Sequence, residues 1–222
     1  MQKIASSVFD IIPFSNGILY TKIATLENGS TRIRFFGYDI KRMQQTPVTK
    51  SVYLLNKYGS GFKKIAEQLG DYVSCDADIM PSKNVVVVYP SGETGIFSPE
   101  GEALWSNDLQ YHEKEIRGVA CDGNEIWSVV PDLNCLVCYS LSHKKFSMRI
   151  GAEKASTFDK PVSVYKYNDE LFISNENSNK VRTVNLKDFS VNDFRIFDEP
   201  VHKYIRSCGK EIVMLDSGVY IL

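Results

Sequence analysis

Several features that would point to a particular class of protein are missing from this sequence. No stretch approaches the roughly 18 uninterrupted apolar residues of a membrane-spanning helix, so no membrane span is expected. Residues 1–17 lack the apolar core and the small-residue cleavage site of a signal peptide. The chain has 26 basic and 27 acidic residues, and its formal net charge of −1 creates no overall field that would attract nucleic acid or an anionic membrane.

Cysteine and histidine are too few and too scattered to indicate a metal site. The five cysteines are an odd number, and without an export signal they predict reduced thiols in a cytoplasmic protein. Cys135 and Cys138 form a C-x-x-C pair, but their neighbours favour a β-strand, where residues three apart point to opposite faces. The three histidines have no spacing typical of metal ligands. We therefore expect no metal, no cofactor and no Ser-His-Asp arrangement.

What the sequence does contain is a series of short β-branched and aromatic runs, separated by glycine, asparagine, aspartate and proline. Four units repeat one order of features: a first strand, a polar pair, a strongly apolar second strand, a polar turn and a further strand. The second strands begin their apolar runs at intervals of 41, 45 and 41 residues, at Val85, Ile126, Leu171 and Ile212. A four-stranded unit of about 40 to 45 residues is the repeat of a β-propeller blade.

A fifth unit is predicted near the N-terminus, with Ile18 in the position of Val85. These two residues are 67 apart, about 25 more than the repeat allows. We interpret the extra length as a hairpin inserted around residues 30–47, after which residues 51–69 would supply the third and fourth strands. The sequence thus predicts an all-β protein with a single domain, residues 1–222, that forms a five-bladed β-propeller. The alternative of six blades would split this long unit in two.

The two ends of the chain predict how the ring closes. The last unit stops after its third strand, whereas residues 2–8 alternate in polarity and belong to no other unit. We expect this N-terminal strand to complete the last blade, because closure hides the strand edges that an open ring would expose.

One unit, residues 160–186, resembles the blades of the NHL-like and YncE-like propeller families. The match is carried by Pro161, Val164, Leu171, Ile173, Asn175, Asn179, Val181 and Val184. A second unit, residues 115–141, fits more loosely through Gly118, Val119, Asp122, Gly123 and Trp127. The resemblance implies the propeller fold. Members of these families bind proteins, RNA or small molecules and related propellers are enzymes, so it implies no single activity.

Candidate site residues follow from the alignment of the units. Propellers bind ligands over the central channel, at mouths formed by the loops that feed the innermost strands. In three units an ionisable residue stands nine positions before the aligned apolar residue, and further ionisable residues lie beside these positions. The predicted ligand-binding residues at the channel mouth are Asp76, Asp78, Arg117, His202 and Lys203. The alternative is that these charges pair with each other around a water-filled channel.

We predict a non-enzymatic binding or scaffold module, monomeric, whose partner is a protein or a small molecule. The enzymatic alternative is glycoside hydrolysis, which some five-bladed propellers perform and which needs two carboxylates on different elements. The candidate carboxylates are Asp10, Asp76, Asp78 and Glu115. Because the aromatic and acidic signatures that flank such carboxylates are missing, we favour binding.

Nucleic acid is not an expected partner. The basic clusters at residues 62–68 and 142–149 are assigned to turns and outer strands, where charge is usually solvated.

Overall fold

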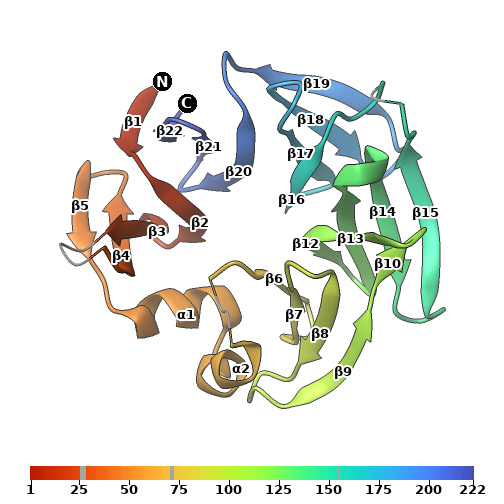
Figure 1. Cartoon of the computed structure of the whole chain (residues 1–222), viewed down its shortest axis with the longest axis horizontal. Helices are drawn as coiled ribbons and strands as arrows, with labels where there is room; N and C mark the ends of the chain where they lie inside the picture. Colours follow the sequence, from red (N-terminus) through yellow and green to blue (C-terminus); the bar gives the residue numbers. More distant parts are fainter. Residues whose placement is uncertain (26–28, 71–72, 155) are drawn as a thin grey trace.

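The computed structural model of this chain describes residues 1–25, 29–70, 73–154 and 156–222. Within these residues, five four-stranded antiparallel sheets stand side by side in a ring (Figure 1). The predicted five-bladed β-propeller is therefore confirmed, and the six-bladed alternative is excluded.

Each blade runs from an inner to an outer strand. Blade 1 contains β2 (Val8–Phe14), β3 (Gly17–Thr25), β4 (Thr31–Asp39) and β5 (Gln44–Pro47). Blade 2 contains β6 (Asp76–Ile79), β7 (Val85–Val88), β8 (Glu93–Phe97) and β9 (Ala103–Asp108). Blade 3 contains β12 (Arg117–Asp122), β13 (Glu125–Val130), β14 (Cys135–Ser140) and β15 (Lys145–Gly151). Blade 4 contains β16 (Pro161–Tyr167), β17 (Glu170–Asn175), β18 (Lys180–Asn185) and β19 (Val191–Ile196). Blade 5 contains β20 (Val201–Ser207), β21 (Lys210–Leu215), β22 (Gly218–Ile221) and β1 (Gln2–Ala5).

The remaining elements lie between blades or at blade ends. They are α1 (Lys50–Tyr58), α2 (Phe62–Leu69), the two-stranded ribbon of β10 (Gln110–Tyr111) and β11 (Lys114–Glu115), and the 3-10 turn η1 (Pro131–Leu133). In the described part of the chain, no helix has the length and apolar content needed to cross a membrane.

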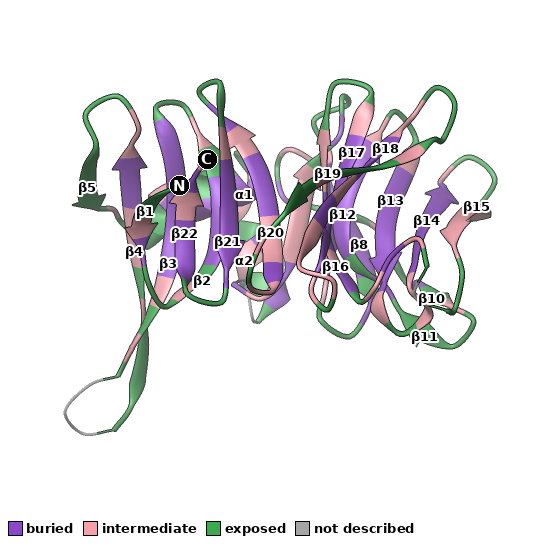
Figure 2. Ribbon diagram, turned by 90° about the horizontal axis from the view of Figure 1, so that it is seen from above, coloured by how far each residue is buried: buried purple, intermediate pink, exposed green. Residues whose placement is uncertain are grey.

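The second strand of each blade is buried on both faces, which explains its continuous apolar sequence. All four valines of β7 are buried, and β13 and β17 are buried at five of their six positions. Figure 2 shows β13 largely in the colour of buried residues. Their side chains form apolar clusters between neighbouring blades. The two cysteines of the C-x-x-C pair point to opposite faces of blade 3, as expected for a strand. Cys135 lies in the apolar cluster shared with blade 2, and Cys138 lies in the cluster shared with blade 4.

The ring closes as predicted, because β1 pairs with β22 as the outer strand of blade 5. Gln2 lies opposite Ile221, and Ala5 lies opposite Val219. Ala5 is buried in the cluster that joins blade 5 to blade 1. Gly218 allows this approach, since a Cβ atom there would lie only 2.1 Å from the carbonyl oxygen of Ala5.

The structure corrects the prediction for blade 1. Residues 30–47 are not an inserted hairpin: they contain β4 and β5, the third and fourth strands of the blade. Tyr20 of β3 pairs with Phe36, and Tyr38 pairs with Gln45. The surplus residues are instead residues 50–69, which form α1 and α2 rather than two strands.

Local sequence signals account for the first helix. Thr49 caps α1, its hydroxyl accepting a hydrogen bond from the Val52 amide at 3.3 Å, and Gly59 ends it at a φ of 70°. Burial at Tyr53 and Leu54 is repeated one helical turn later at Lys57 and Tyr58. This spacing is that of a helix, whereas a strand would bury every second residue.

The two helices form a wedge between blades 1 and 2 (Figure 1). Tyr53, Ile65 and Leu69 from the helices share one apolar cluster with Leu19 of blade 1 and Val87 of blade 2. The wedge therefore supplies the apolar contacts that neighbouring sheets make directly at the other junctions.

The closure of the ring is testable at Gly218, with Gly209 as a matched control. Both glycines have positive φ values, 145° and 72°, but a Cβ at Gly209 would meet no atom within 4 Å. We expect Gly209→Ala to lower the free energy of unfolding by about 1 to 2 kcal/mol through backbone strain alone. Gly218→Ala should lower it by about 1 to 3 kcal/mol more, because the added methyl group pushes β1 off the sheet. Urea unfolding measures both values.

The same pair of variants gives a second readout. Detachment of β1 should also speed tryptic cleavage after Lys3 in Gly218→Ala and leave it unchanged in Gly209→Ala. Equal stability losses and equal cleavage rates in the two variants would contradict the proposed role of Gly218.

Candidate functional site

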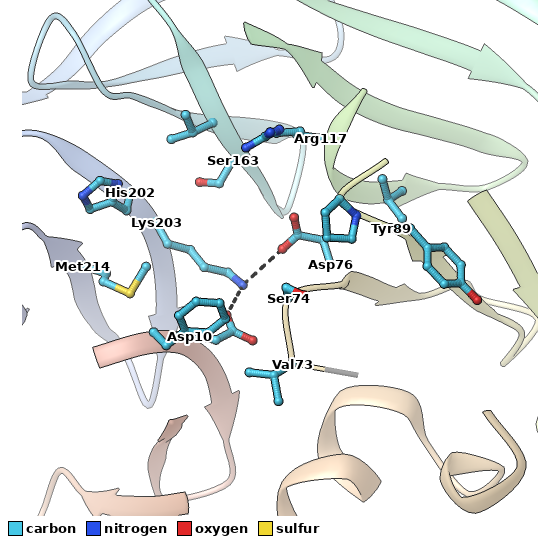
Figure 3. A pocket seen from close by; sticks show the side chains of 14 residues that line it. Asp10, Val73, Ser74, Asp76, Tyr89, Arg117, Ser163, His202, Lys203 and Met214 are labelled. Carbon is cyan, nitrogen blue, oxygen red and sulfur yellow. Dashed lines mark hydrogen bonds and ion pairs between the residues drawn. The ribbon is translucent and has the colours of Figure 1, made fainter. Parts of the chain in front are cut away.

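The inner strands of all five blades converge on a cavity at one end of the ring axis, which we call the mouth cavity (Figure 3). It has a volume of about 260 Å³. Its wall includes Phe9 and Asp10 from β2, Asp76 from β6, Arg117 from β12, Val162 and Ser163 from β16, and His202 and Lys203 from β20. The wall thus includes, from each of the five units, the residue that stands nine positions before the aligned apolar residue of the second strand. These five residues are Phe9, Asp76, Arg117, Val162 and Lys203.

Irregularities in the inner strands explain why two consecutive residues of one strand can both line the mouth cavity. The pairing register shifts between Val8 and Asp10 in β2, between Pro161 and Ser163 in β16, and between Val201 and Lys203 in β20. Strand β12 has a similar shift after Arg117. Such a β-bulge breaks the alternation of side chains and re-aims one of them.

A second cavity, the lower cavity, lies behind the mouth cavity and also measures about 260 Å³. The two cavities share Asp76, Ser163 and Lys203 in their walls. These shared residues therefore stand at the boundary between the two spaces.

Asp10 is the most densely paired side chain of this region. Its carboxylate is buried and accepts hydrogen bonds from the Tyr53 hydroxyl at 2.5 Å, from Lys57 Nζ at 2.8 Å and from Lys203 Nζ at 2.7 Å. Burial by itself would raise the pKa of Asp10, but the charges of Lys203 and Lys57 outweigh that effect and hold it well below its usual range. Asp10 is therefore ionised and fully engaged.

Lys203 extends this pairing across the axis of the ring. Its Nζ lies 2.7 Å from Asp10 Oδ1 and 3.6 Å from Asp76 Oδ1 (Figure 3). Burial alone would lower the pKa of Lys203, but the two carboxylates raise it above its ordinary value. Asp76 in turn accepts a hydrogen bond from the Gly118 amide at 3.2 Å. The ion bridge Asp10–Lys203–Asp76 thus connects blades 5, 1 and 2, and Asp76 links it to blade 3.

The structure brings together four of the five residues predicted at the channel mouth, namely Asp76, Arg117, His202 and Lys203. His202 lies nearer the rim, where its Nε2 is 2.5 Å from Asp216 Oδ1. Their role in binding a ligand stays a prediction.

Asp78, the fifth predicted residue, faces the lower cavity instead. Its carboxylate accepts hydrogen bonds from the backbone amides of Cys121 and Ile79, at 2.7 and 2.8 Å. Burial raises the pKa of Asp78.

Two groups in the mouth cavity lack partners among the described residues. Arg117 is exposed and makes no ion pair there, in contrast to Lys57 and Lys203. The Ser163 hydroxyl is buried, in a residue only 5% exposed, and has no hydrogen-bond partner in the described structure. Sequence analysis missed Ser163, because only the bulge in β16 turns it towards the axis.

The four candidate carboxylates do not form the pair that glycoside hydrolysis requires. Asp10 is held ionised by two lysines, and Asp76 is engaged by Lys203 and the Gly118 amide. Asp78 shares the lower cavity with Asp76, but its carboxylate is engaged by the backbone amides of Cys121 and Ile79. Glu115 is exposed in β11. A catalytic pair needs one protonated and one ionised carboxyl group, both open to the same substrate. Since this arrangement does not provide one, we do not propose glycoside hydrolysis.

Metal-ligating side chains do not gather elsewhere in the part of the chain that the structure describes. There, no three histidine, cysteine, aspartate or glutamate side chains are grouped closely enough to hold an ion.

Comparison with known proteins supports the fold alone. No protein-family model and no curated protein matches the chain. A streptogramin B lyase structure matches with a TM-score of 0.52 and 12% identity, over 98% of this chain and 66% of that one. Sqt1 from Saccharomyces cerevisiae matches with a TM-score of 0.50 and 12% identity, over 95% of this chain and 67% of that one. The structure of U3-55K gives a TM-score of 0.52 at 9% identity, over 97% and 61%.

This chain therefore spans about two thirds or less of the length of these structures. The matches confirm the expected resemblance only at the level of the β-propeller fold. At identities this low they carry no activity over to this protein.

The ion bridge predicts a specific dependence of stability on pH. Replacing Asp10 with Asn should lower the free energy of unfolding by about 3 to 5 kcal/mol at neutral pH, because Lys57 loses its counter-ion and Lys203 keeps only the longer contact with Asp76. The folded-state pKa of Asp10 lies below its unfolded value of about 3.9, so its contribution is complete above that value. It should then be lost progressively as the pH falls towards the folded-state pKa.

Urea unfolding between pH 3 and 7 measures this dependence. The stability gap between the wild type and Asp10→Asn should be constant at pH 5 to 7 and shrink below about pH 4. Asp169→Asn, which breaks an exposed ion pair with Lys187, is the control and should change stability little. A gap that is independent of pH down to pH 3 would contradict the charged role of Asp10.

Proposed function

We propose that this protein is a non-enzymatic binding propeller that holds a small molecule in its mouth cavity. One observation carries the proposal: residues from the inner strands of all five blades surround a single cavity with both charged and apolar groups. Ligand sites are typically concave, mostly apolar, and furnished with a few convergent polar groups.

The form of the cavity favours a bound ligand over a passage. The ion bridge stands where the mouth cavity meets the lower cavity, so the mouth has a charged floor. An entering molecule would meet Asp76 and Lys203 rather than pass through the ring. The cavity volume of about 260 Å³ is just below the usual range of about 300 to 1,000 Å³ for ligand pockets. This size suits a small metabolite and is too small for a folded protein segment.

Two further expectations belong to this proposal. All five cysteines are free thiols, four of them buried, which is consistent with a cytoplasmic protein in a reducing compartment. The balanced charge of the chain gives no reason to expect nucleic acid as a partner.

A variant that fills the mouth cavity tests the proposal. A small-molecule library should contain compounds that raise the melting temperature of the wild type. A compound at 100 times its Kd stabilises by about 2.7 kcal/mol, which corresponds to about 5 to 10 °C for a chain of this length. Val162→Trp should abolish these shifts, because the indole would occupy the cavity.

Asn192→Trp is the matched control, since Asn192 is exposed in β19 on the outer edge of blade 4 and should leave the shifts unchanged. Circular dichroism would verify that both variants keep the fold. Melting-temperature shifts that persist in Val162→Trp would place the binding site elsewhere and refute the proposal.

A further inference from the structure

We propose that the ligand of the mouth cavity is a small organic monocarboxylate, bound by the Arg117 guanidinium with a second hydrogen bond from the Ser163 hydroxyl. This inference rests on the proposed function and specifies the chemistry of the same site. It depends on three observations: the balance of charge in the wall, an unpartnered buried hydroxyl, and the apolar surface beside them.

The ion pairs around the mouth cavity leave one cation over when Lys57, which contacts Asp10 from behind the wall, is included. Asp10 and Asp76 then balance Lys57 and Lys203. His202 lies against Asp216, so it has its own counter-ion when protonated. Arg117 alone has no carboxylate within ion-pair distance among the described residues. A ligand with one negative charge would supply the counter-ion that Arg117 lacks and neutralise this set of charges, whereas a dianion would leave an excess.

Arg117 also borders another cavity, of about 500 Å³, whose wall includes Glu113, Glu115 and Asp132. These acids do not pair with the guanidinium, and Asp132 is 3.5 Å from Lys114 Nζ instead. They disfavour an anion on that side of Arg117. An anionic ligand is therefore expected on the side of Arg117 that faces the mouth cavity.

Ser163 provides the independent evidence for a ligand. Ser163 is only 5% exposed, and its hydroxyl has no hydrogen-bond partner in the described structure. The strand that carries it runs beside the strand of Arg117: a Cβ on Gly118 would lie 3.3 Å from Ser163 Cα. Figure 3 shows both side chains on the part of the wall opposite Asp10. A ligand oxygen held by Arg117 could accept the missing hydrogen bond.

Carboxylate is the anion that this pair of groups fits best. The planar guanidinium binds a carboxylate through two parallel hydrogen bonds, and a phosphate would bring more than one negative charge at neutral pH. Phe9, Val162 and Met214 add apolar surface to the cavity. This surface would accommodate the hydrocarbon part of the ligand.

Matched probes separate charge from shape. Isothermal titration of the purified chain with isovalerate and benzoate should show binding, whereas isovaleramide and benzamide should bind at least about tenfold more weakly. Arg117→Met should weaken carboxylate binding by about 10- to 100-fold, and Ser163→Ala by about three- to tenfold. Arg195→Met, which removes an arginine paired with Glu211 on an outer strand, is the control and should leave binding unchanged. Inorganic phosphate and succinate test for other anions and should bind more weakly than the monocarboxylates.

The outcomes distinguish this inference from the function on which it rests. In one outcome, neutral or cationic compounds bind in a way that Val162→Trp abolishes and Arg117→Met does not change. That result overturns the carboxylate assignment and leaves the proposed function intact. Carboxylate binding that neither variant weakens overturns both, because the binding site is then outside the mouth cavity. No measurable binding of the monocarboxylate probes also overturns the assignment, and the library screen then decides the proposed function separately.

Discussion

The pairing of the Asp10 carboxylate is the interaction on which the centre of this ring depends. It joins the inner strand of blade 1 to Lys57 of the helical wedge and to Lys203 of blade 5. Burying three charges is unfavourable unless each has partners of opposite sign and its remaining hydrogen-bonding groups are satisfied. Tyr53 and the carbonyl oxygen of Val73 meet that condition by hydrogen bonding to Asp10 and Lys57. The wedge, the first blade and the last blade are consequently held by one cluster, and loss of Asp10 would leave Lys57 buried without its counter-ion.

This cluster lies at the one irregular junction of the ring. The other blades pack sheet against sheet, but blades 1 and 2 are separated by α1 and α2, whose apolar faces complete the core. Polar side chains of α1 that reach into this apolar core would destabilise the fold if they lacked hydrogen-bond partners. The Asp10 carboxylate accepts hydrogen bonds from both Tyr53 and Lys57 of α1. The insertion that breaks the repeat therefore supplies partners for a carboxylate in the wall of the mouth cavity. The irregular junction and the candidate site are thus parts of the same arrangement.

The repeated features of the fold could be predicted from the sequence, whereas the structure of the segments that depart from the repeat could not. Intervals of 41 and 45 residues identified the blades, and the alternation of residues 2–8 identified the closing strand. Interval length alone does not say where surplus residues lie, so α1 and α2 were mistaken for strands although Thr49 and Gly59 mark the ends of a helix. The Asp10–Lys57 pair spans 47 residues and involves that unrecognised helix. Ser163 was missed because a bulge, which depends on the pairing of two strands, turns it inward.

Stability and binding place different demands on the groups of the mouth cavity. Asp10, Lys57 and Lys203 satisfy one another, so their presence is accounted for by the folded structure alone. Arg117 and Ser163 contribute no comparable pairing: an exposed guanidinium without a counter-ion adds little to stability, and a buried hydroxyl without a partner reduces it. Where local rules of folding are broken without a compensating gain in the structure, a functional role is the expected reason. Other buried side-chain atoms of the described structure also lack partners, but Ser163 is the one among them that lies in the wall of the mouth cavity. Its position near the unpaired Arg117 is the physical basis for assigning a ligand to this cavity.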